Sequence, residues 1–298
     1  MSAAGMTEGY SSRRPRKLAP GRIGLYAFLV VAALFFLLPL YVLVITSLKP
    51  MDEIRLANIF ALPETWTFEP WLKAWAYACT GRECTGVSAG FWNSVQIVVP
   101  ATIASIFVGA LNGYALAIWR PRGSSLLFNI ILLGGFVPFQ IFIYPLVRMY
   151  SAVGIFGSLL GIVVLHIIFG LPVMMLLFRN YYSSLPADLF RAARVDGGSF
   201  WSIFFRLALP MSTPVLIVAV ILQVTGIWND YLAGLIFAGR DYMPMTVQLN
   251  NIVNPRQSAT EYNVNMAATI LTALVPLAVY FFSGRWFVRG IAAGAVKG

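Results

Sequence analysis

The chain has 298 residues, of which 59% are hydrophobic and only 11% are charged, and its formal net charge is +10. This composition excludes a water-soluble globular protein, whose surface carries more charge. The charged residues occur in clusters separated by long uncharged stretches, a pattern typical of a protein with several membrane spans.

Residues 1–22 are polar and rich in arginine, which predicts a disordered tail. The following domain, residues 23–298, contains six charge-free runs, each longer than the 20 or so helical residues that cross a hydrocarbon core. We therefore predict an all-α, polytopic membrane protein with six transmembrane helices at about residues 23–48, 91–119, 124–147, 157–178, 209–235 and 264–285. The uncharged stretch 242–255 is too short for a span and is predicted to be a loop.

The distribution of cations predicts the orientation of the chain. With a cytoplasmic N-terminus, the inner segments hold 14 of the 21 basic residues and three acids, which makes +11 inside and −1 outside. Both termini are therefore expected in the cytoplasm. The cations flank helix ends and form no stripe on a folded face, so no nucleic-acid partner is expected.

The two cysteines, Cys79 and Cys84, lie in the outer segment between the first two predicted spans. The outer side is oxidising, so we predict a disulfide that closes a small glycine-containing loop, with free thiols as the alternative. No histidine lies nearby, and no metal site is expected.

Several kinds of chemistry have no matching residues. None of the four lysines completes a Gly-x-x-x-x-Gly-Lys-Ser/Thr phosphate loop, so ATP is not bound by that route. The six runs contain no charged residue of the kind that an ion-coupled carrier usually keeps at mid-membrane. His166 has apolar neighbours, and we expect a neutral imidazole hydrogen-bonded to another helix, with a proton relay as the alternative.

A polar and aromatic cluster lies at the outer end of the fifth predicted span. It consists of Trp228, Asn229, Asp230 and Tyr231. Aromatic rings can stack on sugar rings while amide and carboxylate groups pair with hydroxyls, so the cluster is a candidate substrate contact. The alternative is that the rings are ordinary interfacial anchors.

The inner segment 185–210 combines charged, small and glycine residues. A short helix is predicted to begin after Pro186, with Asp188 in its first turn, and to end where Gly197 permits a sharp turn. A second short amphipathic helix is predicted to reach Pro210. The segment could fill a groove of another protein, or it could lie on the lipid headgroups.

The segment resembles the EAA loop of binding-protein-dependent ABC importer permeases. Five residues match the pattern at the family's spacing, namely Ala192, Ala193, Asp196, Gly197 and Pro210, while Arg191 replaces the usual glutamate. Residues 228–231 resemble the Trp-Asn-x-Phe/Tyr element of carbohydrate permeases, and residues 287–298 resemble the tail of MalG-type subunits. The segment 79–94 is similar to glucose/mannose-type permeases.

The resemblance implies the type I ABC importer permease fold and a chain that is not an enzyme. The coupling segment would comprise Arg191, Ala192, Ala193, Arg194, Asp196, Gly197, Gly198, Phe200 and Pro210. The implied partners are a second permease subunit, two ATPase subunits that bind Mg-ATP, an extracytoplasmic sugar-binding protein, a carbohydrate substrate and the lipids of a bacterial cytoplasmic membrane.

In MalG-type proteins the outer loop before the last span reaches into the binding protein. Asn250, Asn251 and Asn254 are the corresponding candidates here, and an inert loop is the alternative. The rival function is an ion-coupled secondary sugar transporter that acts without an ATPase.

Overall fold

The computed structural model describes residues 20–56, 58–80, 83–255 and 259–295, with the side chains of 285–295 left out. Most of the predicted tail, residues 1–22, lies outside the described residues. The described residues form helices and contain no strand, which confirms the all-α prediction.

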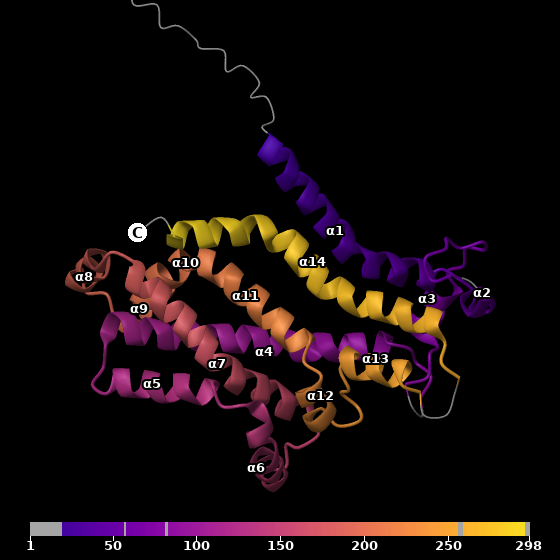
Figure 1. The fold of residues 1–298 in the computed structure, drawn as a ribbon. Helices are drawn as coiled ribbons and strands as arrows, with labels where there is room; N and C mark the ends of the chain where they lie inside the picture. The colour runs from indigo at the N-terminus through magenta and orange to yellow at the C-terminus, as the bar shows by residue number, and fades with distance from the viewer. Residues whose placement is uncertain (1–19, 57, 81–82, 256–258, 296–298) are drawn as a thin grey trace, which may run out of the picture.

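Four helices are long and apolar enough to cross a membrane without a break. They are α1 (Pro20–Ser47), α4 (Ser88–Tyr114) with its π-helical extension η1 (Ala115–Trp119), α7 (Leu159–Ser184) and α14 (Tyr262–Ala295). Helices α4 and α7 pack against each other, and Figure 1 shows α11 (Thr213–Trp228) between them and α14, whereas the N-terminal half of α1 leaves the bundle.

At the third and fifth predicted spans, the structure has two helices that meet at a sharp angle in place of one continuous helix. The third consists of α5 (Ser124–Gly135) and α6 (Phe139–Ala152), which meet at 101°. The fifth consists of the segment Phe200–Met211 and α11 (Thr213–Trp228), which meet at 77°. Pro138 is the last residue of the first break, where it disfavours helical geometry in the residue before it, and Pro214 lies in the first turn of α11. Neither proline donates a backbone hydrogen bond to a preceding turn.

Helices α4 and α7 approach each other closely because α4 presents glycine to α7. A Cβ atom on Gly109 would lie 2.4 Å from the Cβ of Met174, and one on Gly113 would lie 2.7 Å from the backbone nitrogen of Arg179. The two glycines form a Gly-x-x-x-Gly pair, the spacing that allows helix backbones to meet within a membrane.

Short helices cover the two ends of the bundle (Figure 1). One end carries α8 (Ala187–Val195) and α9 (Phe200–Ile203). The other carries α2 (Met51–Leu56), α3 (Glu69–Ala76) and α13 (Met245–Val253). The structure also contains a disulfide between Cys79 and Cys84, shortly after α3.

The stretch 242–255 contains helix α13, although the sequence predicted a loop. Pro244 precedes its first turn, and Met245, Gln248 and Ile252 are buried at a helical spacing. These side chains pack against α4 and α14, so tertiary burial stabilises a helix in a polar stretch.

Candidate functional site

Helix α8 ends in a Schellman turn, in which two backbone N–H groups bond back to the last turn of the helix. The N–H of Gly198 donates to the carbonyl of Ala193 at 2.9 Å, and the N–H of Gly197 donates to that of Arg194 at 3.0 Å. Gly197 has a φ of +81°, which favours glycine. The predicted helix and sharp turn are therefore present between 187 and 198.

The outer side of α8 faces away from the bundle. Arg191, Ala192, Asp196 and Gly197 are exposed, and Val195 keeps 87% of its surface. Arg191 forms an ion pair with Asp188 one turn earlier on the same exposed helix, so the two charges largely offset each other. The exposed side of α8 therefore has small side chains, little net charge and one strongly exposed apolar side chain, Val195.

The inner side of α8 packs against the end of the second predicted span. Phe190 is buried, and the guanidinium of Arg194 donates to the carbonyl of Ile118 at 2.7 Å while lying over the ring of Trp119. These contacts join α8 to η1, which extends α4.

The segment 185–210 packs against aromatic side chains that were not predicted as site residues. The Tyr114 hydroxyl donates to the carbonyl of Phe200 at 3.2 Å and accepts from Trp119 Nε1 at 2.7 Å. The ring of Tyr114 packs against those of Tyr182 and Phe204. The signal in the sequence is the concentration of Tyr and Trp at the predicted inner ends of the second and fourth spans.

The rest of the predicted coupling segment leads into α11 through a bend. Residues Phe204–Ala208 form a second π-helical turn, η2, and Leu209–Met211 form α10, in which Pro210 is exposed. At the bend, Ser212 Oγ is 2.8 Å from the Tyr182 hydroxyl and 2.6 Å from the carbonyl of Ala208. The segment is thus tied to α7 at the point where α11 begins.

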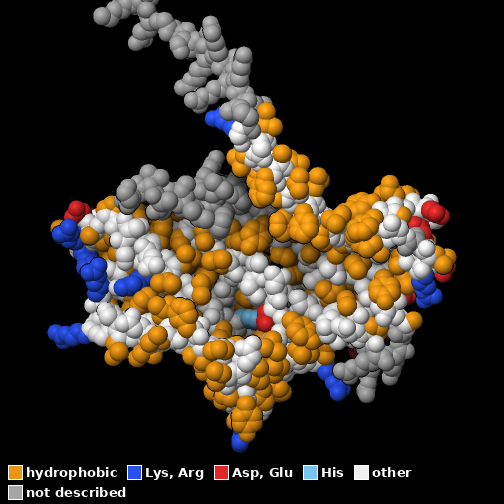
Figure 2. Space-filling model, viewed as in Figure 1, with side chains coloured by type: hydrophobic (Ala, Val, Ile, Leu, Met, Phe, Trp, Pro, Cys, Tyr) orange, Lys and Arg blue, Asp and Glu red, His pale blue; other side chains and the backbone are white. Residues whose placement is uncertain are grey.

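A separate cavity of about 570 Å³ opens between α6, α7, α11 and α12 (Leu232–Phe237). Figure 2 shows a hollow near the middle of this face, in which a histidine and an acidic side chain are visible. Four polar side chains line the cavity, Gln140, His166, Gln223 and Asp230, among apolar groups. Such a lining, apolar with a few polar groups, is typical of small-molecule sites.

His166 and Asp230 meet in this cavity, from α7 and from the turn after α11. His166 Nε2 lies 3.6 Å from Asp230 Oδ2, and Asp230 Oδ1 accepts from the backbone N–H of Ala233 at 3.3 Å. Among the described residues, the expected hydrogen bond from His166 to another helix is not formed, because 3.6 Å exceeds hydrogen-bond range and Asp230 lies in the turn after α11.

The other members of the 228–231 cluster lie elsewhere. Trp228 is 2% exposed and donates from Nε1 to the carbonyl of Thr272 at 3.0 Å, so its ring belongs to the packing between α11 and α14. Asn229 and Tyr231 are exposed and do not line the cavity. Of the four candidates, the structure places Asp230 alone at the cavity.

At the opposite end from α8, helix α13 is docked on the start of α4. The N–H of Gly90 donates to Gln248 Oε1 at 2.7 Å, and the N–H of Met245 donates to Ser94 Oγ at 2.9 Å. Asn250 and Asn251 are half-buried on α13, and Asn254, which follows it, is exposed and donates to Asn250 Oδ1 at 3.1 Å. The three asparagines thus lie at the C-terminal end of α13, a helix that is hydrogen-bonded to α4.

The geometry defines a class of protein, a multi-pass membrane protein with a partly polar cavity on one face and an exposed short helix at one end. A family model described as "binding-protein-dependent transport system inner membrane component" matches residues 101–293. The chain belongs to this family: it is an ABC importer permease subunit that works with a binding protein and with ATPase subunits, and it is not itself an enzyme.

Relatives support this assignment. The osmoprotective compounds uptake permease protein GgtD of Synechocystis is 38% identical over 72% of each chain. The alpha-glucoside transport system permease protein AglG of Rhizobium meliloti is 34% identical over 97% of this chain and 76% of its own. The crystal structure of a bacterial ABC transporter that imports the acidic polysaccharide alginate superposes with a TM-score of 0.73 at 18% identity, covering 91% of this chain and 99% of that one, and shows the fold.

Proposed function

We propose that this chain conducts a carbohydrate through a bacterial cytoplasmic membrane as one half of a pair with a different permease subunit, both of its termini lying inside. The observation that carries the proposal is the exposed helix α8, which follows α7, is bonded to η1 through Arg194, and continues through α9 and η2 to a bend where Ser212 is bonded to α7. Relatives named for alpha-glucosides and alginate support a carbohydrate as the substrate.

The orientation follows from the charges at the two ends of the bundle. In Figure 2 the end that carries α8 displays mostly basic side chains, whereas the opposite end displays acids and bases together. The positive-inside rule then favours α8 in the cytoplasm and α13 outside.

A second permease subunit has apolar surface available to it. Helix α6 projects from the bundle (Figure 1), and its side chains Ile141 and Tyr144 are 64% and 70% exposed. Apolar surface of this kind marks an interface with protein or lipid. A different permease chain, packed against α6 and facing the cavity, would complete the path.

The proposed mechanism transmits closure of the ATPase subunits through α8. These subunits, and not this chain, would bind Mg-ATP. On closing they would carry α8 with them, and the contacts of Arg194 with η1 and of Tyr182 with Ser212 would move α4, α7 and α11 together. ATPase closure can shift the conformation of this chain only if the ATPase subunits bind α8 with different strength in their open and closed states. The Asp188 pairing means that Arg191 needs no acidic partner in the ATPase groove.

The carbohydrate would pass along the cavity that contains His166, Asp230, Gln140 and Gln223. Planar amide, imidazole and carboxylate groups suit the hydroxyls of a sugar. The similarity of segment 79–94 to glucose/mannose-type permeases makes a hexose the first substrate to test.

Transport assays test the proposal. The chain, its partner permease and the ATPase subunits are reconstituted in liposomes, and uptake of labelled sugar is measured with and without binding protein and Mg-ATP. We expect uptake to require both, and Asp230→Ala to reduce it by about tenfold, the loss of one charged hydrogen bond to the substrate. Uptake driven by an ion gradient in this chain alone would instead support a secondary carrier.

The outer asparagines are proposed to contact the binding protein. Replacing Asn250, Asn251 and Asn254 together with alanine keeps α13 helical, and each lost hydrogen bond is worth about 1 kcal/mol, so we expect uptake to fall at least about fivefold. Alanine is preferable to a deletion, because removing 250–256 would also remove the buried Ile252.

The control for this triple variant is Asn129→Ala on α5, which is exposed far from α13. Assembly of both variants is checked by co-purification of the ATPase subunits. Undiminished uptake by the triple variant would mean that these side chains are inert.

A further inference from the structure

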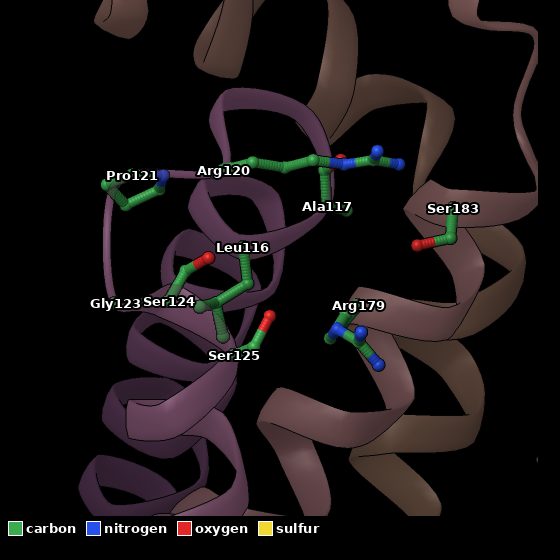
Figure 3. A pocket seen from close by; sticks show the side chains of 9 residues that line it. All are labelled: Leu116, Ala117, Arg120, Pro121, Gly123, Ser124, Ser125, Arg179 and Ser183. Atoms are coloured by element: carbon green, nitrogen blue, oxygen red, sulfur yellow. The ribbon is translucent and has the colours of Figure 1, made fainter.

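A second cavity, of about 580 Å³, lies at the α8 end of the bundle and belongs neither to the path nor to the exposed side of α8. Figure 3 shows it between the end of η1, the turn at 120–123, the first turn of α5 and the last turns of α7. We propose that this cavity binds the phosphate of an anionic phospholipid headgroup from the inner leaflet.

Two arginines from different elements line the cavity. The guanidinium of Arg179, on α7, lies 4.1 Å from the centre of the Phe128 ring, which leaves the hydrogen-bond donors at its edge available. Arg120 uses Nε to donate to the carbonyl of Ala117 at 3.0 Å, and its terminal amino groups remain. Among the described residues neither arginine forms an ion pair, and no acid lines the cavity.

The backbone of Arg120 is held in an unusual conformation. It has a φ of +47°, the only positive φ outside glycine in the part of the chain that the structure describes. Glycine or asparagine would adopt this conformation more readily, and strained residues concentrate at ligand sites. In Figure 3 the conformation directs the Arg120 side chain across the cavity towards Ser183.

Hydroxyl groups complete the lining. Figure 3 shows the hydroxyls of Ser124, Ser125 and Ser183 pointing into the space between α5 and α7. The first turn of α5, a helix of 12 residues, has no side-chain cap on its N–H groups. Guanidinium, hydroxyl and backbone N–H donors are the groups that bind phosphate oxygens.

The location favours a phosphate attached to a lipid. The cavity lies where three spans end, beside the exposed ring of Trp119, and aromatic rings of this kind mark the level of the headgroups. Leu126 and Leu127, at the start of α5, are 66% and 53% exposed and offer apolar surface for an acyl chain. With the orientation proposed above, this end faces the anionic inner leaflet.

The same lipid would lie next to the coupling segment. A neighbouring cavity of about 230 Å³ shares Arg120 and Ser183 with the first, and is also lined by Arg191 and Arg194. A bound phosphate would offset charge among these arginines and hold the 120–123 turn beside α8. Anionic lipid is therefore expected to favour coupling by the assembled importer.

Binding of phosphatidylglycerol to the assembled importer tests the proposal without requiring transport. The importer is purified in neutral detergent and titrated with phosphatidylglycerol or phosphatidylcholine, and bound lipid is counted by native mass spectrometry. We expect R120Q/R179Q to bind phosphatidylglycerol about thirtyfold more weakly than the wild type. The matched control, R148Q/R240Q, loses the same charge at two residues that line neither this cavity nor its neighbour, and it should bind as the wild type does.

A second variant guards against a folding defect in the first. Ser125→Asp places a carboxylate in the cavity, and an acid in the first turn of a helix favours helix formation. It should lose phosphatidylglycerol while unfolding at the wild-type temperature. Equal binding by R120Q/R179Q and its control, or by Ser125→Asp and the wild type, would overturn the proposal.

Competition with inorganic phosphate identifies the source of the phosphate. We expect excess inorganic phosphate to leave phosphatidylglycerol bound, because the apolar surface holds the acyl chain. Displacement by inorganic phosphate, with no preference for phosphatidylglycerol over phosphatidylcholine, would overturn the assignment to a lipid. Binding that appears only after the ATPase subunits are removed would also overturn it, since a protein partner would then cover the cavity.

Discussion

Replacing Gly198 with valine is expected to reduce ATP-driven uptake to background while the chain still inserts in the membrane. A Cβ at this position would lie 2.5 Å from the carbonyl oxygen of Ala193 and 2.9 Å from Ile203 Cγ1. The Schellman turn cannot then close, and α8 cannot return against α9. Uptake and ATP hydrolysis stimulated by the binding protein are measured in proteoliposomes with equal amounts of assembled importer.

Gly197→Ala is the matched control for this turn. No atom lies within 4 Å of a Cβ on Gly197, so the substitution costs only the left-handed backbone, about 1 kcal/mol. We expect uptake within about twofold of the wild type. Wild-type transport by Gly198→Val would show that the turn is not needed for coupling.

Replacing Gly113 with valine is expected to have the largest effect on folding. The new side chain would collide with α7 at the backbone nitrogen of Arg179 and at the Cβ of Phe178, both 2.7 Å from the Cβ position. Backbone atoms cannot turn aside, so we expect a loss of about 3 kcal/mol in the free energy of unfolding. The unfolding temperature in detergent, followed by fluorescence-detected size exclusion, measures the loss.

Gly134→Val provides the comparison, because no atom lies within 4 Å of its Cβ position near the end of α5. Both variants add the same side chain to an apolar helix, so helix propensity affects them alike. Equal unfolding temperatures would mean that the packing of α4 on α7 does not depend on the absence of a side chain at Gly113.

The long apolar helices and the helix with its sharp turn at 187–198 could be predicted because each depends on local signals. Charge-free runs limit the spans, and Pro186 and the glycines at 197–198 delimit α8. The breaks at 136–138 and 212 were not predicted, since a run of apolar residues has the same composition whether it is straight or bent. Helix α13 was missed because its stability comes from burial against α4 and α14.

Only part of the candidate site could be predicted, because local sequence signals do not show which distant residues come into contact. Asp230 was selected from its neighbours in the sequence, but its contact with His166 joins positions far apart in the chain. Trp228 was selected with it, although the 100° step between successive helical residues directs its ring towards α14. The phosphate cavity depends on Arg120 and Arg179, which only the close approach of α4 and α7 brings together.

Helix α1 is the most independent part of the fold. Within this chain, only 6% of the 18-residue apolar stretch of α1 is buried, and the helix packs against α14. The family match begins after α1, at residue 101. Most positions of α1 therefore require only a hydrophobic residue, and the helix as a whole requires a length that crosses the membrane. Over evolutionary time α1 should drift faster than the core, and a span from an unrelated membrane protein should be able to replace its N-terminal half.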